Sequence, residues 1–323
     1  MKKQKKRMPL VHGANLAEKE ADRSKYGKAD SKEYLTQIRL KYDEWHQGNM
    51  ALVGPSSAVA ETDRQIIDKR VELFSLYKDF LDQQHYAEHF DSRSNLHSSV
   101  LEEFMYYLFK DLVAEFGEHA LIGKSHTFKD IFFAPPNYTE MLKRPHAGVE
   151  RKDHDFVIGA AIEASFHSAV PPSQSSGSGE VEVILAEPED YAEVAVTGNS
   201  ETHLFDVPAI AIECKAYLDK NMLEGSSRSA EELKARNPNG LYMVVMEWIK
   251  LADAVNLRKY KVDQIYVLRR QKNTDRDKRY LTGYVKNPID ADVVWHLYTT
   301  VRAYLTSDWL GGVESGIQRG WLI

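Results

Sequence analysis

A short strand of the fully buried type, ending in an acid and a base, constrains this chain more than any other feature. Residues 207–212 are almost wholly apolar, and Glu213, Cys214 and Lys215 follow them directly. Such a run is typical of a central strand covered on both faces, as in α/β folds. Because side chains alternate along a strand, Glu213 and Lys215 project from the same face. The pattern predicts an α/β fold with an ionisable pair at the end of a buried strand.

A second apolar strand, at residues 156–159, begins directly after Asp155. If the two strands are neighbours, Asp155 meets Glu213 and Lys215. Carboxylates that hold a hard divalent cation let it bind a phosphodiester and lower the pKa of the attacking water. Because Mg²⁺ keeps several waters, Asp155, Glu213 and the backbone carbonyl of Cys214 suffice as ligands, while Lys215 would orient the water and stabilise charge on the phosphate. We therefore expect the catalytic site of an Mg²⁺-dependent nuclease; the alternative is a solvated ion pair on an edge strand.

Asp155 together with residues 213–215 resembles the PD-(D/E)XK nuclease superfamily, whose shared core is a mixed sheet flanked by helices. The longer stretch 213–225, with the apolar strand 240–247, resembles the BbvCI-type (Bpu-ten-I) group of type II restriction endonucleases. The resemblance covers about residues 95–270. It implies site-specific cleavage of double-stranded DNA with Mg²⁺ and a second nuclease subunit, with an unlike subunit favoured over a homodimer.

One departure from compact superfamily members is the spacing of about 58 residues between Asp155 and Glu213. Residues 170–179 are rich in Pro, Ser and Gly, which predicts a loop insertion within about 165–205. An acidic stretch at 187–193 would repel phosphate, so we expect it to point away from DNA. Three other acids remain rival metal ligands to Asp155, namely Asp153, Glu163 and Asp206.

Helical periodicity dominates the first third of the chain. Residues 1–32 are polar and are expected to be a flexible segment, whereas 33–94 carry apolar residues at helical spacing and are a candidate for DNA grip or subunit contact. The nuclease domain would then span 95–323. Its first helix, at 99–116, would be capped by Ser98 or Ser99. Further along, we expect a helix at 229–236, strands at 241–248 and 264–270, and a helix at 291–305.

Glu102 lies in the first turn of the helix expected at 99–116. Many superfamily nucleases place a helix acid near the metal, and the resemblance therefore makes Glu102 a further candidate ligand. The alternative is an ordinary first-turn acid that the helix dipole favours.

The segment 258–279 holds nine Lys and Arg residues against three Asp residues. It is either a solvated surface hairpin or a face that contacts phosphate. The candidate DNA-binding residues in it are Arg258, Lys259, Lys261, Arg269 and Arg270.

Composition is compatible with a DNA enzyme despite a net charge of −6, because a negative body often carries a positive groove. The single cysteine excludes an internal disulfide, and no apolar run has the length of a signal peptide or a membrane span, so we expect a cytoplasmic protein. Two other functions stay open at this point: a repair or mobile-element nuclease, and a non-catalytic DNA-binding subunit with the same fold.

Overall fold

The computed structural model describes residues 9–90, 94–167, 196–197, 200–273, 278, 280–309 and 317. The helices are α1 Val11–Ala21, α2 Arg23–Tyr26, α3 Ala29–Ala51, α4 Asp63–Leu81, α5 Gln84–His89, α6 Leu96–Ala114, α7 Tyr138–Lys143, α8 Lys220–Lys234 and α9 Ala291–Thr306, with a 3-10 turn at Leu257–Lys259. The strands are β1 Ala120–Phe133, β2 Ala147–His167, β3 Val196–Thr197, β4 Ser200–Leu218, β5 Leu241–Ile249 and β6 Gln264–Val267.

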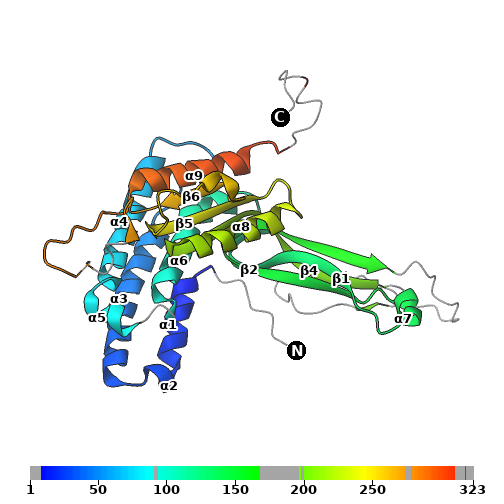
Figure 1. Cartoon of the computed structure of the whole chain (residues 1–323), viewed down its shortest axis with the longest axis horizontal. Helices are drawn as coiled ribbons and strands as arrows, with labels where there is room; N and C mark the ends of the chain where they lie inside the picture. Colours follow the sequence, from blue (N-terminus) through cyan, green and yellow to red (C-terminus); the bar gives the residue numbers. More distant parts are fainter. Residues whose placement is uncertain are drawn as a thin grey trace.

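The strands form one mixed sheet in the order β1-β2-β4-β5-β6, with β3 paired to β4 (Figure 1). β2 pairs antiparallel with both β1 and β4, whereas β4, β5 and β6 run parallel to one another. The parallel connection from β4 to β5 passes through α8, which is the crossover that a parallel pair requires. This architecture confirms the predicted mixed sheet flanked by helices.

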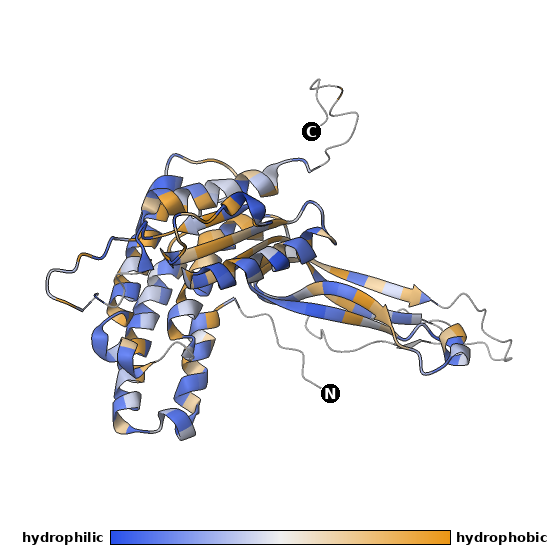
Figure 2. Cartoon of the chain, viewed as in Figure 1, coloured by the Kyte–Doolittle hydropathy of each residue, from blue (hydrophilic) through white to orange (hydrophobic). Residues whose placement is uncertain are grey.

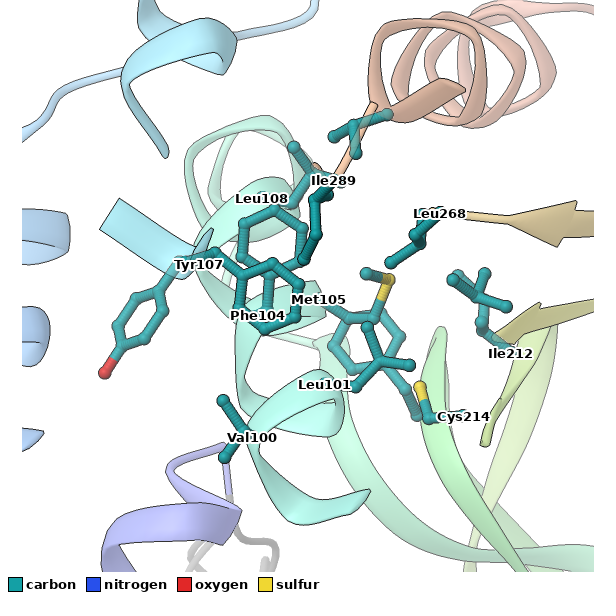
Figure 3. Close-up of a cluster of buried hydrophobic side chains, with 14 of the residues drawn as sticks. Val100, Leu101, Phe104, Met105, Tyr107, Leu108, Ile212, Cys214, Leu268 and Ile289 are labelled. Carbon is teal, nitrogen blue, oxygen red and sulfur yellow. The ribbon is translucent and has the colours of Figure 1, made fainter. Parts of the chain in front are cut away.

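β4 is covered on both faces, as its apolar sequence predicted. Ile210, Ile212 and Cys214 pack on one face against the apolar side of α6, where Leu101 and Met105 lie (Figure 3). Residues on the opposite face, among them Ala211, Tyr242 and Val244, pack against Leu223 and Ala230 of α8. Figure 2 shows the resulting concentration of apolar residues in the central strands. The sheet therefore lies between α6 and α8.

The strands β1, β2 and β4 extend beyond the helical layers as a long arm that ends near α7 (Figure 1). Large apolar side chains in this outer part are exposed, among them Phe132, Phe133 and Met141. At the root of the arm a register irregularity occurs between Ile158 and Gly159 of β2. A Cβ atom on Gly159 would lie 2.1 Å from the carbonyl oxygen of Val207, so only glycine permits this close approach of β2 and β4.

The expectation of a flexible segment up to residue 32 is wrong for residues 11–26, which form α1 and α2. The first backbone N–H groups of α1 are satisfied by a distant partner: Glu103 of α6 accepts hydrogen bonds from His12 N at 2.8 Å and Gly13 N at 2.9 Å. The buried His12 ring lies 2.8 Å from Ser99 Oγ and 2.7 Å from Tyr77 OH. Tertiary contacts, rather than local sequence, hold this segment in place.

Other boundaries differ in smaller ways. The periodic stretch 62–90 forms two helices, α4 and α5. Neither Ser98 nor Ser99 caps α6; its N-cap residue is Asn95, and the Ser99 hydroxyl donates to the Asn95 carbonyl at 2.7 Å. The expected loop at 170–179 and the acidic stretch 187–193 lie outside the described residues. The division into three regions at residues 32 and 94 stays a prediction.

Within the described part of the chain, no helix is both long enough and apolar enough to cross a membrane.

Candidate active site

Asp155, Glu213 and Lys215 meet where β2 and β4 run side by side. The antiparallel register pairs Phe156 with Ile212, which brings Asp155 beside Glu213. The Lys215 Nζ atom lies 3.2 Å from Asp155 Oδ2 and 2.9 Å from Glu213 Oε1. The three side chains are 24, 21 and 27 % exposed for Asp155, Glu213 and Lys215, so they are sheltered but reachable by solvent. The predicted proximity of these residues is confirmed, whereas their catalytic roles stay a prediction.

An irregularity in the pairing of β1 with β2 positions Asp155. Gly123 pairs with Val157 and Ser125 pairs with His154, so a step of two residues on β1 corresponds to a step of three residues on β2. The extra residue on β2 makes a β-bulge, a feature that redirects side chains near functional sites. The backbone N–H of Cys214 then donates to Asp155 Oδ2 at 3.0 Å and fixes the carboxylate.

Electrostatics keep Glu213 and Lys215 charged. Burial raises the pKa of Glu213, but the Lys215 ammonium and the hydroxyls of Ser226 and Tyr242 outweigh burial, so the pKa is lowered. Burial lowers the pKa of Lys215, and the charges of Asp155 and Glu213 more than offset it, so that pKa is raised. Lys215 is therefore a cation at neutral pH and not a free base.

Tyr242 and Ser226 belong to the site but were not predicted from the sequence. The Tyr242 hydroxyl donates to Glu213 Oε2 at 2.7 Å. Tyr242 lies in the apolar strand β5, which pairs with β4 so that Glu213 is opposite Val244. Because side chains alternate along a strand, Tyr242 lies on the same face as Val244. This two-residue spacing in the sequence could have indicated that Tyr242 faces Glu213.

Glu102 is buried in α6, and its Oε2 atom lies 2.9 Å from the Lys124 Nζ atom of β1. Burial raises the pKa of Glu102, the nearby Asp155 charge raises it further, and Lys124 acts in the opposite direction. The structure therefore places Glu102 within electrostatic reach of Asp155, with Lys124 as its partner. Sequence reasoning missed Lys124, because a single lysine in a strand of mixed composition carries no motif.

The rival acids lie elsewhere. Asp206 accepts a hydrogen bond from the Ser125 hydroxyl, seven residues along β4 from Glu213, or about 23 Å at strand spacing. Glu163 is exposed on the arm, eight residues or about 26 Å along β2 from Asp155. Asp153 is exposed and paired with His126. Of the four acids, only Asp155 lies beside Glu213.

His154, next to Asp155, is buried with its ring centroid 5.9 Å from that of Tyr242. Burial lowers the pKa of His154 to about 4, with a further contribution from Lys152. The imidazole is neutral at physiological pH and packs as a structural side chain.

The donor set fits a hard cation. Asp155 and Glu213 offer carboxylate oxygens, the ligand type that Mg²⁺ prefers. The Cys214 side chain is buried against α6, so only its backbone carbonyl remains as a third donor. Among the described residues no cluster of three His, Cys, Asp or Glu side chains is arranged to hold a metal ion, and metal binding by Asp155, Glu213 and the Cys214 carbonyl stays a prediction.

The basic segment needs one correction. Arg269 is 1 % exposed, and its guanidinium lies 2.7 Å from Glu247 and 3.0 Å from Asp79, so it is an internal ion-pair partner and not a DNA contact. Arg270 is exposed and pairs with Asp290 at 2.9 Å. Arg258, Lys259 and Lys261 are exposed, and their contact with DNA stays a prediction.

The family model described as Bpu10I restriction endonuclease matches residues 93–192 and 189–322 of this chain. A solved structure titled "native BbvCI A2B2 tetramer at low resolution" has a TM-score of 0.60 and 18 % identity, covering 93 % of this chain and 97 % of that one. This likeness shows a shared fold across both lengths. No curated protein sequence matches the chain at a significant level.

Proposed function

Since this chain belongs to the Bpu10I restriction endonuclease family, we propose that Asp155, Glu213 and Lys215 form the active site with which it hydrolyses double-stranded DNA. The observation that carries the proposal is the Lys215 ammonium, held at 3.2 Å and 2.9 Å from the two carboxylates on the adjoining strands β2 and β4. The family membership favours restriction over repair or transposition and over a non-catalytic role.

Asp155, Glu213 and the Cys214 carbonyl would hold Mg²⁺, which binds the scissile phosphate and lowers the pKa of the attacking water. Tyr242 fixes one oxygen of Glu213, and the Cys214 N–H fixes one oxygen of Asp155. Lys215 orients the water and stabilises the negative charge that develops on the phosphate. Glu102, paired with Lys124 and close enough to Asp155 for their charges to interact, would be a further ligand.

A double-strand break needs two such sites, because one site hydrolyses one strand. We propose that the second site belongs to an unlike subunit, as an identical pair would favour a palindromic target. The solved structure that shares this fold is titled a tetramer of two kinds of subunit, which supports the proposal.

Cleavage of supercoiled plasmid with Mg²⁺ tests the site. Lys215→Ala and Glu213→Ala are expected to lower the rate by at least about 10²–10³-fold, as when a charge-stabilising group is lost, while DNA binding is retained. Lys220→Ala is the matched control, because Lys220 is exposed in the next helix and only weakly paired with Glu224 at 3.7 Å. Cleavage by Lys215→Ala at the control's rate would refute the assignment.

The same assay tests the ion and the partner. Excess chelator should abolish cleavage and Mg²⁺ should restore it, while Ca²⁺ should support binding with little cutting. The chain alone should yield open circles at most, and addition of the unlike subunit should yield linear DNA. Rapid linearisation by this chain alone would show that it works as a homodimer.

A further inference from the structure

A cavity of about 440 Å³ lies next to the candidate active site, between α1, α2 and the start of α6. We refer to it as the α1 cavity. Its charged lining includes Lys19, Lys25 and Lys124, and its amides are Asn15 and Asn95. Lys124 is shared: the same side chain lines the cavity and pairs with Glu102 at 2.9 Å. The cavity is therefore linked to the candidate active site through Lys124 and Glu102.

Lys19 is the most unusual residue of this cavity. It is 7 % exposed, and its ammonium donates to the Asn15 side chain and lies 5.8 Å from the Tyr26 ring centroid. Within the part of the chain that the structure describes, its hydrogen-bond partner is this neutral amide and not a carboxylate. Burial lowers the pKa of Lys19, the charge of the adjacent Glu18 opposes this by raising it, and Lys25 lowers it further, so the pKa is lowered overall. A buried ammonium whose nearby opposite charge, Glu18, is exposed to solvent is costly, and an anion in the cavity would lower that cost.

Two acids also line the cavity, and their surroundings differ. Asp22 is the N-cap of α2, where its carboxylate accepts the N–H groups of Ser24 at 3.0 Å and Lys25 at 3.1 Å. The Asp22 carboxylate therefore caps α2. Glu18 is exposed to solvent, where water screens it. The buried charge inside the cavity is that of Lys19.

The α1 cavity is rigidly tied to the active site. Two consecutive residues of α6 connect the active site with α1. Glu102 pairs with Lys124, and Glu103 accepts hydrogen bonds from the first N–H groups of α1. We propose that the α1 cavity binds a backbone phosphate of the DNA strand that flanks the scissile phosphate, with Lys19 and Lys25 as its contacts. This inference rests on the proposed function. Phosphate contacts of this kind set the position of the duplex and carry no sequence information.

The test measures how the binding of a random-sequence duplex by the full chain in Ca²⁺ depends on salt between 50 and 200 mM. Each phosphate contact contributes about −0.9 to the slope of log K against log salt. Lys19→Met and Lys25→Met are each expected to reduce the magnitude of the slope by about 0.9. Lys69→Met is the control, because Lys69 is exposed on α4 and pairs with Glu72. Because methionine has nearly the volume of lysine, the melting temperature of the Lys19→Met protein should not fall below that of the wild type.

Three outcomes would overturn the inference. If the wild-type chain cuts DNA and both variants keep the wild-type slope, the cavity does not contact DNA, while the active site stands. If inorganic phosphate raises the melting temperature of the wild type but not of Lys19→Met, with unchanged slopes, the cavity takes free phosphate instead. If the wild type retains no duplex even at 50 mM salt, both the inference and the proposed function fail.

Discussion

Replacing Lys215 by Met probes the active site through stability, independently of cleavage. The ammonium lies within 3.2 Å of two carboxylates, and its loss leaves Asp155 and Glu213 facing each other without a countercharge. Removing one partner of a fully buried pair costs about 3–5 kcal/mol, whereas an exposed pair contributes about 0–1 kcal/mol. The three side chains are 21 to 27 % exposed, so the cost lies between these limits, at about 2 kcal/mol of unfolding free energy.

The pH dependence follows from the lowered pKa of Glu213. In the wild type its stabilisation is present above the ordinary value of 4.5 and is lost as pH falls through the lowered pKa. Without Lys215 the largest contribution that opposes burial is lost, so the pKa of Glu213 should be higher than in the wild type. As pH falls, Glu213 is then protonated at a higher pH in Lys215→Met than in the wild type. The difference in unfolding free energy between the two proteins should therefore shrink as pH falls from 7.5 towards 5. Divalent cations should stabilise the variant more than the wild type.

Urea unfolding at pH 7.5 and pH 5, with and without Mg²⁺, measures these differences. Lys220→Met is the control and should stay within about 0.5 kcal/mol of the wild type, because Lys220 is 62 % exposed. A Lys215→Met protein as stable as the wild type at pH 7.5, or one whose deficit grows at pH 5, would refute the view that Lys215 neutralises this carboxylate pair.

The remaining predictions concern three other positions. Glu103→Ala leaves two N–H groups of α1 unsatisfied and should cost about 3 kcal/mol in urea unfolding, with faster proteolysis within α1; equal stability would contradict the anchoring of α1. Tyr242→Phe removes a donor that lowers the pKa of Glu213, so the acid limb of the pH–rate profile should move to higher pH, and an unmoved limb would count against this role. Asp155→Asn should abolish cleavage while Asp153→Asn retains most of it, and the reverse result would move the metal ligand.

The central strand and its ionisable pair were predictable because the signal is local. Apolar composition over residues 207–212 marks burial, and alternation fixes which face Glu213 and Lys215 share. The position of Asp155 beside Glu213 and Lys215 was also predictable, since Asp155 directly precedes a second apolar run that had to be a neighbouring buried strand. Residues 156–158 are buried as that interpretation requires.

What remained hidden depends on contacts between distant parts of the chain. The carboxylate that satisfies the first N–H groups of α1 belongs to Glu103, which is 91 positions from His12. The polar sequence of α1 taken alone therefore predicted a flexible segment. Arg269 lies in a run of charges, and only the fold brings Glu247 and Asp79 to it. Lys124 meets Glu102 because β1 packs against α6, and nothing in the local sequence of β1 marks that contact.

The arm has a mechanical consequence. β2 and β4 run without interruption from its outer end to the active site, and Ser200 lies about 43 Å along β4 from Glu213 at strand spacing. Asp155 lies on β2 and Glu213 on β4, while the outer part of the arm carries the exposed Phe132 of β1 and Met141 of α7, and the Gly159 irregularity lies between the two regions. A displacement of the outer end of the arm would therefore be transmitted along the same two strands whose spacing fixes the separation of the two carboxylates.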